Sequence, residues 1–234
     1  MKTRSGKRDG ALGYSRKNLR TMHRVLLTRF RNEAKLRVEV NSMNRMQPLS
    51  RPELLAVLKI ARANGVRDHA LLLLCFAHGM RVSECGQLLL SDISTKNWTV
   101  RVKRVKGSLE TLQILSANSE RLLDERRVLT EWLALRINDS PYLFPSRNKR
   151  GSLSRVQVYR MFRSYCEQAG IADAKRGIHA LKHSLGQRMA DAGCDVKEMR
   201  LALGHKSLSS TVHYFEVRQE QADRARQVAL MSRV

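Results

Sequence analysis

The sequence predicts a mainly α-helical fold with one small antiparallel β-sheet. Apolar residues recur at helical spacing through most of the chain, and strict alternation of apolar and polar residues begins only at Trp98. Of the 234 residues, 42% are hydrophobic, which is enough to build a buried core. The longest apolar run, Ala70 to Ala77, is much shorter than the roughly 18 residues that cross a bilayer. Charged residues follow Met1 where a leader would be apolar, so we expect a cytoplasmic protein without a membrane span.

The charge of the chain points to a polyanionic partner. Lys and Arg number 44 against 21 Asp and Glu, a formal net charge of +23. Nucleic acid is the commonest partner of such a protein, because each neutralised phosphate releases a condensed counterion. The cysteines form no CxxC pair and lie in apolar stretches, so we expect reduced, packed thiols at Cys75, Cys85, Cys166 and Cys194.

The charge is densest in residues 1–49. That segment holds 13 Lys and Arg against three acidic residues, a net charge of +10. Its helical periodicity is modest, and it could not form a core alone. We therefore expect two parts, a basic helical N-terminal arm over residues 1–49 and a folded domain over residues 50–234.

The first two helices of the domain follow from local signals. Ser50-Arg51-Pro52-Glu53 is a capping box with an early proline, and the helix that it opens ends at Gly65. A second helix, nearly all apolar, runs from Asp68 to Ala77 and should lie in the middle of the core. Gly79 breaks this helix.

A β-hairpin is predicted next. One face of the first strand is apolar, the turn is Lys106-Gly107-Ser108, and Thr111–Leu115 form the returning strand. Lys106 is therefore expected near the tip of the hairpin. The apolar face of the first strand consists of Trp98, Val100 and Val102.

The rest of the domain is predicted to be helical. Helical spacing resumes over Leu122–Leu133 and stops at the loop Pro141–Pro145. A second capping box, Ser154–Gln157, opens a helix that ends at Gly170. Further helices are expected over Ile178–Ala192, over Asp195–Leu203 and around Ser209–Tyr214, with an amphipathic tail from Val217.

Three features of the sequence could carry chemistry on a nucleic acid. They are Arg81 after the glycine break, the run from His179 to His183, and Gly204-His205 followed by Tyr214. Breaking a phosphodiester without a metal requires a nucleophile, cations that neutralise the charge on the phosphoryl oxygens, and an acid for the departing oxygen. This set of residues supplies all three.

In their order and spacing, these features resemble the tyrosine recombinase (phage integrase) family from Ser50 to Ala229. The family pattern is Arg, a Lys on a hairpin, His-x-x-Arg, His or Trp, and then Tyr. The matching residues are Arg81 in Gly-Met-Arg-Val-Ser-Glu, Lys106, His179, His205 after Gly204, and Tyr214. The resemblance implies the fold of a tyrosine recombinase catalytic domain.

The resemblance also implies an activity, site-specific DNA recombination or integration of the kind that serves mobile elements. Tyr214 would attack the scissile phosphate of double-stranded DNA to give a 3′-phosphotyrosyl link, within a homo-oligomer on paired DNA sites. It implies no metal or nucleotide cofactor. It also implies that Arg81, Lys182 and His205 contact the phosphoryl oxygens. His179 would assist removal of the tyrosine proton, Lys106 would protonate the leaving 5′-oxygen, and Glu84 would orient Arg81.

The chain departs from the family pattern at Lys182, where the family usually has arginine. A guanidinium binds two phosphate oxygens in a planar fork, whereas an ammonium offers a point charge. The sequence therefore leaves open whether the chain is fully active with lysine at position 182. Arg176, in the preceding turn, is the residue expected to compensate, and Arg188 should point elsewhere.

The histidines could also form a metal site. His179 and His183 are four residues apart on a predicted helix, and His205 could be a third ligand. The HExxH glutamate is missing, and the recombinase pattern already uses two of these three histidines, so we predict no metal. We expect His183 to be a structural partner at the back of the pocket. There is no GxxxxGK[ST] loop to support a nucleotide-driven reaction.

Two other functions stay open at this point. The chain could be a DNA-binding relative of the family that is inactive or catalytically weakened by Lys182. It could also be a monomeric relative of the type IB topoisomerases, which would relax supercoiled DNA without site preference.

Overall fold

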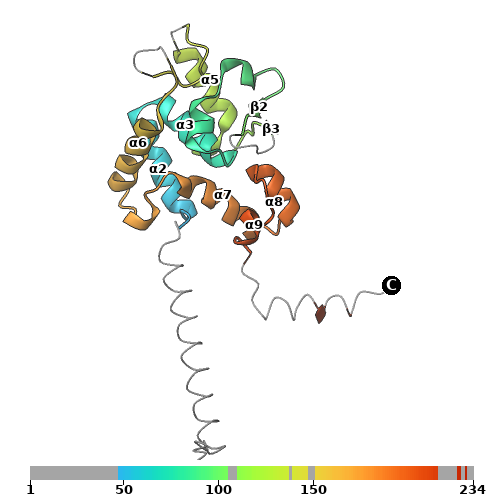
Figure 1. The fold of residues 1–234 in the computed structure, drawn as a ribbon. Coiled ribbons are helices and arrows are strands. Elements are labelled where there is room, and N and C mark those ends of the chain that lie inside the picture. The colour runs from blue at the N-terminus through green and yellow to red at the C-terminus, as the bar shows by residue number, and fades with distance from the viewer. Residues whose placement is uncertain are drawn as a thin grey trace, which may run out of the picture. The chain divides into compact units, whose positions relative to one another are not determined.

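The computed structural model describes residues 47–104, 110–136, 139–146, 151–215, 226–227 and 230. These residues belong to one compact unit, Met46–Val234. Figure 1 shows the arrangement of the helices and strands, coloured from blue to red along the chain. The symbol η denotes a short 3-10 helix. The elements are α2 (Arg51–Asn64), α3 (Val66–Ala77), α4 (Val82–Gly86), η1 (Leu90–Asp92), β1 (Ile93–Ser94), β2 (Thr99–Val102), β3 (Thr111–Ile114), η2 (Arg121–Leu123), α5 (Glu125–Leu135), α6 (Arg155–Gln168), η3 (Asp173–Lys175), α7 (His179–Asp191), α8 (Val196–Leu203) and α9 (Ser209–Val212).

The predicted helix boundaries are largely confirmed. Ser50 caps α2 as half of a capping box, in which the Ser50 N–H donates to Glu53 Oε2 at 2.7 Å, and Ser154 caps α6 in the same way. Gly193 follows the cap of α7 and Gly204 caps α8, and their φ values of 79° and 62° are in the left-handed region that glycine tolerates.

Two helix predictions need correction. The apolar helix begins at Val66, two residues before the predicted start at Asp68. The helix expected over Leu122–Leu133 is split into η2 and α5, because Asp124 interrupts it and accepts the N–H of Arg127 as the cap of α5.

The sheet has the order β1-β2-β3, and both pairs of strands are antiparallel. Val102 pairs with Thr111, which confirms the predicted hairpin. The prediction that Trp98 opens its first strand is wrong, because Trp98 has a φ of 51° and lies in the turn between β1 and β2. Strand β1 was not predicted, since two residues are too few to show an alternating pattern.

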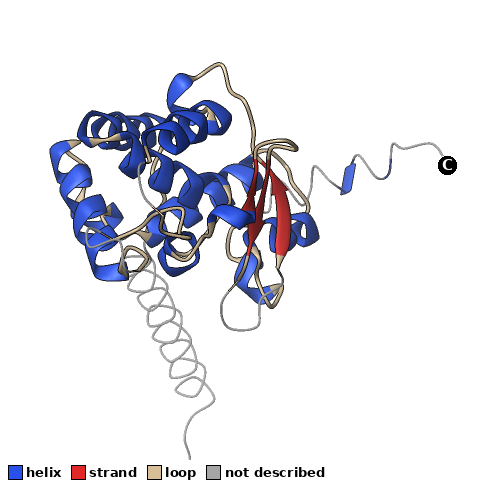
Figure 2. Cartoon of the chain, turned by 90° about the horizontal axis from the view of Figure 1, so that it is seen from above, coloured by secondary structure: helices blue, strands red, loops and turns tan. Residues whose placement is uncertain are grey.

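Helix α3 lies in the middle of the core, as its composition predicts. Helices α2, α5 and α7 pack against it, and the sheet lies to one side of the helices (Figure 2). Every residue of α3 from Asp68 to Phe76 is buried. Three of the cysteines are buried, Cys194 is half-buried, and all four thiols are free, as predicted.

Parts of the predictions fall outside the described residues. They include the basic arm apart from residues 47–49, the tip of the hairpin with Lys106, and almost all of the tail after Val217. Among the residues that are described, no helix combines the length and apolar character that a bilayer crossing requires.

Candidate active site

Arg81 is placed by the break between α3 and α4. Gly79 has a φ of 53°, and a Cβ built there would come within 2.7 Å of Cδ2 of Leu203, so the turn requires glycine. Arg81 then becomes the N-cap of α4. Its backbone N–H donates to Glu84 Oε2 at 2.8 Å, and its Nη1 donates to Glu84 Oε1 at 2.7 Å. The Glu84 side chain is 0% exposed and that of Arg81 is 31% exposed, so a buried carboxylate orients a guanidinium that reaches solvent, as expected.

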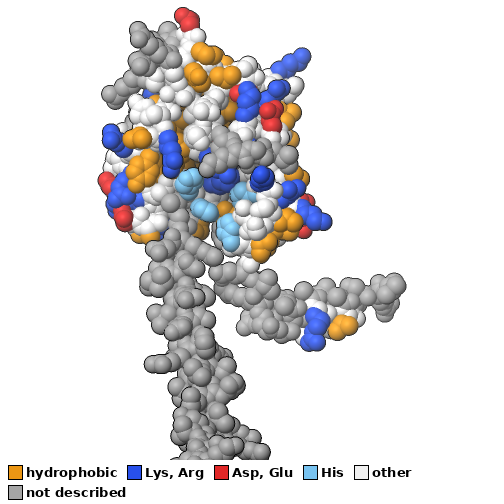
Figure 3. All heavy atoms as spheres, in the orientation of Figure 1, with side chains coloured by type: hydrophobic (Ala, Val, Ile, Leu, Met, Phe, Trp, Pro, Cys, Tyr) orange, Lys and Arg blue, Asp and Glu red, His pale blue; other side chains and the backbone are white. Residues whose placement is uncertain are grey.

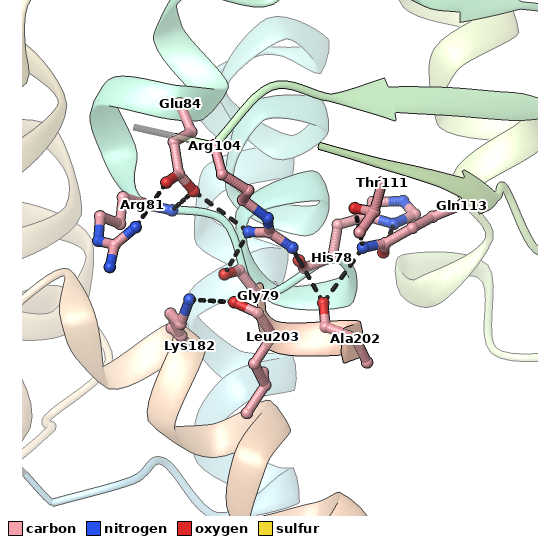
Figure 4. Close-up of polar contacts among 10 residues, drawn as sticks. All are labelled: His78, Gly79, Arg81, Glu84, Arg104, Thr111, Gln113, Lys182, Ala202 and Leu203. Atoms are coloured by element: carbon pink, nitrogen blue, oxygen red, sulfur yellow. Dashed lines mark hydrogen bonds and ion pairs between the residues drawn. The ribbon is translucent and has the colours of Figure 1, made fainter. Parts of the chain in front are cut away.

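Arg104 is a second arginine at this carboxylate, and it was not predicted. Its guanidinium lies between Glu84 and the carbonyl groups at the ends of α3 and α8 (Figure 4). Nη1 donates to Gly79 O at 3.0 Å and to Glu84 Oε2 at 3.1 Å, and Nη2 donates to His78 O and Ala202 O, each at 2.9 Å. Its side chain is 0% exposed, so this cation is used entirely within the protein.

A signal for Arg104 was present in the sequence. Val100 and Val102 form the buried face of β2, and Arg104 is the next residue in the same alternation. An arginine at a buried strand position needs several acceptors, because a charge is costly to bury without them. The acceptors come from helices distant in sequence, so their identity could not be read from the strand.

Lys182, on α7, lies in the same cluster. Its Nζ donates to Leu203 O at 2.5 Å, so the last two carbonyl groups of α8 are bound by Arg104 and Lys182 respectively (Figure 4). The C-terminal end of a helix carries partial negative charge, which favours cations there. Burial, followed by the charge of Arg104, lowers the pKa of Lys182 to about 7, although Glu84 opposes the shift.

Two histidines complete the polar face of the cluster. His179 is the first residue of α7, and its pKa is lowered by burial and then by Arg155, Arg81 and Lys182. His205 follows Gly204, and burial, then the charge of Lys182, lowers its pKa to about 4. Both rings are therefore neutral at neutral pH. His205 Nδ1 lies 2.9 Å from Thr211 Oγ1, which fixes the orientation of the ring.

Gly204 is required by packing as well as by its φ value. A Cβ built there would lie 2.8 Å from Cδ of Arg104. The glycine of the Gly-His pair thus lets the end of α8 close over the buried guanidinium, and His205 follows directly.

Tyr214 lies two residues beyond the end of α9 and packs among histidine rings. Its Oη is 2.9 Å from His183 Nδ1. Its ring centroid is 4.0 Å from that of His213 and 6.5 Å from that of His205, with the latter ring nearly parallel. Only 6% of the residue is exposed, and burial raises its pKa to about 12. The phenol is therefore neutral at neutral pH.

A close contact with α7 explains how the Tyr214 ring fits. A Cβ built at Gly186 would lie 2.6 Å from Cε1 of Tyr214. The ring thus lies directly on the backbone of α7, one turn after His183. A larger residue at position 186 would displace it.

The structure brings five of the six predicted site residues into one region, and the sixth, Lys106, lies outside the described residues. The face of the molecule in Figure 3 shows histidine side chains gathered beside Lys and Arg side chains. The electrostatic effects on His179 and His205 place both rings near the same cations. The five residues are Arg81, His179, Lys182, His205 and Tyr214.

Three expectations for neighbouring residues can be compared with the structure. Arg176 does not compensate for Lys182, because its Nε donates to Ile171 O at 2.7 Å and its Nη1 to Glu167 at 3.2 Å. Arg188 does point elsewhere, with Cζ 5.0 Å from the centroid of the Phe76 ring. His183 is a partner of Tyr214, with Nδ1 2.9 Å from the phenol oxygen. In the part of the chain that the structure describes, no group of three or more His, Cys, Asp or Glu side chains is arranged to hold a metal.

Comparison with known proteins gives a consistent result. The model of the phage integrase family matches residues 44–221. The Type 1 fimbriae regulatory protein FimE of Escherichia coli K12 is 34% identical over 158 residues, which cover 65% of this chain and 75% of that protein. Tyrosine recombinase XerA of Pyrococcus furiosus is 31% identical over 216 residues, covering 88% of this chain and 72% of that protein.

Solved structures show the same fold. The crystal structure of XerA recombinase superimposes with a TM-score of 0.62 at 25% identity, covering 80% of this chain and 66% of that one. XerH site-specific recombinase, bound to its difH substrate in a pre-cleavage complex, superimposes with a TM-score of 0.65 at 24% identity. The chain covers 53% of the length of the XerH chain.

Proposed function

The chain belongs to the phage integrase family of tyrosine recombinases, and we propose that it cleaves and rejoins DNA at specific sites through a 3′-phosphotyrosyl intermediate on Tyr214. The observation that carries the proposal is the position of the Tyr214 phenol, which lies beside His205 and His183 in a cluster that also holds Arg81 and Lys182. A nucleophile and several cations are thus assembled in one region from segments distant in sequence.

In the proposed reaction, Tyr214 Oη bonds to the scissile phosphorus and the bond to the 5′-oxygen breaks. The phenol proton passes to a histidine, and Lys106 protonates the departing 5′-oxygen. Arg81, Lys182 and His205 hold the phosphoryl oxygens as negative charge develops on them, and one such donor is typically worth about 3–4 kcal/mol. Attack of a second 5′-hydroxyl on the phosphotyrosine then reverses the step and rejoins the strands.

Charge is the main support for double-stranded DNA as substrate. The net charge of +23 favours binding to phosphates, and the site-specific recombinase XerH was solved with its difH substrate. We further propose that the chain acts as a homo-oligomer on paired sites in the cytoplasm. Crosslinking on DNA duplexes that carry one or two sites tests the oligomer, because a protein that acts as a monomer would give no product larger than one chain.

Residues 1–49 are proposed to form a basic arm that adds affinity for the DNA backbone more than sequence discrimination. Deletion of the arm should flatten the dependence of log K on log salt, because fewer counterions are released. An unchanged slope in a binding titration would contradict this role.

The nucleophile is tested with a nicked suicide duplex, in which the short fragment that carries the new 5′-hydroxyl diffuses away, so that the covalent complex cannot rejoin its strand. The wild-type chain should give an adduct that survives denaturing gel electrophoresis. Tyr214→Phe should bind the same DNA with similar affinity and give no adduct. An adduct of normal yield in the Tyr214→Phe variant would contradict the assignment.

A weakened, non-catalytic DNA-binding role is the second candidate function, and one observation favours it. Lys182, in place of the usual arginine, is bound to Leu203 O and has a pKa of about 7, so its charge is only partly present at neutral pH. Site-selective binding with no trapped adduct on the suicide duplex would support this role. Relaxation of supercoiled plasmid without site preference would instead support the topoisomerase alternative.

A further inference from the structure

We propose that His183 is a catalytic residue that accepts the phenol proton of Tyr214 as the phenol oxygen attacks phosphorus. This inference rests on the proposed function, because it names the proton acceptor for that reaction. The hydrogen bond between Tyr214 Oη and His183 Nδ1, at 2.9 Å, is within the range that proton transfer requires.

Helix α7 provides both the acceptor and the surface on which the tyrosine lies. His183 and Gly186 are three residues apart and therefore share a face of the helix. Because Gly186 has no side chain, the Tyr214 ring lies against the helix and its oxygen reaches His183. The ring of His213 covers the tyrosine ring at a centroid distance of 4.0 Å. The contact is thus fixed by packing around the ring as well as by the hydrogen bond.

The charge state of His183 suits an acceptor. Burial, followed by the charges of His213, His179 and Lys182, lowers its pKa to about 4. The ring is therefore neutral at neutral pH. With the ring hydrogen on Nε2, Nδ1 carries a lone pair and accepts the hydrogen of the phenol.

A bound phosphate would make this acceptor more basic. His179 and Lys182 on α7 and His213 after α9 act electrostatically on His183, and Tyr214 contacts it directly. A negatively charged phosphate held by the cations offsets their repulsion of a protonated imidazole. DNA binding thus offsets the neighbouring positive charges, which together with burial lower the pKa of His183, and the pKa should rise.

The step balances in both directions. The phenol O–H bond breaks and an Nδ1–H bond forms, while Oη bonds to phosphorus and the 5′-oxygen leaves with the proton from Lys106. During rejoining, neutral Lys106 takes the proton of the attacking 5′-hydroxyl, and protonated His183 returns its proton to the departing phenol. His183 thereby takes the step that the family resemblance assigns to His179.

His179 is better placed for another role. It lies at the N-terminal end of α7, near Arg155, Arg81 and Lys182, and these cations contribute to lowering its pKa. A neutral ring among the phosphate-binding cations is suited to donate a hydrogen bond to a phosphoryl oxygen. The two histidines therefore act on different atoms of the reaction.

The test is the His183→Asn variant, measured in single-turnover cleavage of the nicked suicide duplex between pH 7 and 9. Asparagine keeps a hydrogen-bonding group near the position of Nδ1 but has no basic nitrogen. At pH 7 the adduct should form about 10²–10³-fold more slowly than in wild type. The ratio of variant to wild-type rate should then rise about tenfold per pH unit, because hydroxide increasingly supplies the phenolate. Dividing the variant rate by the wild-type rate at each pH removes the effect of other titrating groups, because they act on both proteins.

The His213→Asn variant is the matched control, because His213 contacts the ring of Tyr214 whereas His183 is bonded to its oxygen. Any loss of rate in this control should be independent of pH. A loss below threefold in His183→Asn, or a ratio that does not change with pH, would overturn the inference. A normal adduct in Tyr214→Phe would instead overturn the proposed function, so the two failures are distinguishable.

A second measurement uses the wild-type chain and so does not depend on the folding of a variant. A duplex with sulfur as the 5′-bridging atom has a leaving group that needs no proton, so only the phenol proton remains in the cleavage step. A solvent deuterium isotope effect of about 2 or more is expected for that transfer. An isotope effect of 1 would overturn the inference.

Discussion

The guanidinium of Arg104 and the carboxylate of Glu84 form an ion pair, with Nη1 3.1 Å from Oε2, in which neither side chain has any exposed surface. Glu84 also binds Arg81, whose side chain reaches solvent. One buried carboxylate thus joins an arginine that is used inside the protein to an arginine that reaches the surface. The hydrogen bonds of Arg104 to the ends of α3 and α8 extend this connection to the segment that leads into His205.

Loss of Arg104 should therefore be costly. Arg104→Met leaves buried carbonyl groups and part of the Glu84 carboxylate without their donor, so the free energy of unfolding should fall by about 3–5 kcal/mol. Chemical denaturation measures this change. The control is Arg101→Met on the same strand, whose side chain is 57% exposed and should change stability by no more than about 0.5 kcal/mol. Equal effects of the two variants would contradict the role given to Arg104.

Lys182→Arg should hold or raise the cleavage rate, with the largest gain at high pH. Because the pKa of Lys182 is lowered to about 7, its ammonium is present below that pH and is lost as the pH rises above it. An arginine keeps its charge throughout this range. The ratio of variant to wild-type rate should thus increase from pH 6 to pH 9 in single-turnover cleavage. A large loss at every pH would show that the site requires lysine.

Gly186→Ala should slow adduct formation by at least about tenfold while DNA binding is retained. The new methyl group would occupy the place of the Tyr214 ring and move the phenol away from His183. In an exposed helix the same change usually stabilises by about 0.5–1 kcal/mol, so a loss of activity would not reflect helix propensity. Gly151→Ala is the control, since a Cβ there meets nothing within 4 Å. Normal adduct formation in Gly186→Ala would show that the observed position of Tyr214 is not required.

Lys106→Ala should cleave an ordinary suicide duplex at least about 10²-fold more slowly. The rate should return to near the wild-type value on a duplex with sulfur as the 5′-bridging atom, because a thiolate leaves without a proton. Gel quantification of the adduct on the two substrates measures this difference. A defect of equal size on both would assign Lys106 to phosphate binding.

Much of the fold follows from local patterns in the sequence. The capping boxes at Ser50 and Ser154 fix helix starts through hydrogen bonds between side chains and the backbone, and Gly204 fixes a helix end through its backbone N–H, all within a few residues. Predictions from periodicity were wrong at two places. Asp124 caps α5 and so divides the predicted helix, and Trp98 lies in a turn instead of opening the predicted strand.

The site was predicted less completely than the fold. The order of Arg81, His179, His205 and Tyr214 identified residues that lie in one region of the structure. Their partners could not be identified in this way, because they depend on tertiary contacts. The acceptors of Arg104 belong to α3, α4 and α8, and the contact between His183 and Tyr214 spans 31 residues.

The central claim, that Tyr214 becomes covalently joined to DNA, is tested most directly by mass spectrometry. The full chain is incubated with a nicked duplex made from its native flanking DNA, digested with protease and nuclease, and searched for peptides that carry a nucleotide. We predict a 3′-linked nucleotide on the peptide that contains Tyr214, and on that tyrosine alone. A nucleotide on any other residue, or none on DNA that the chain binds site-selectively, would contradict the claim.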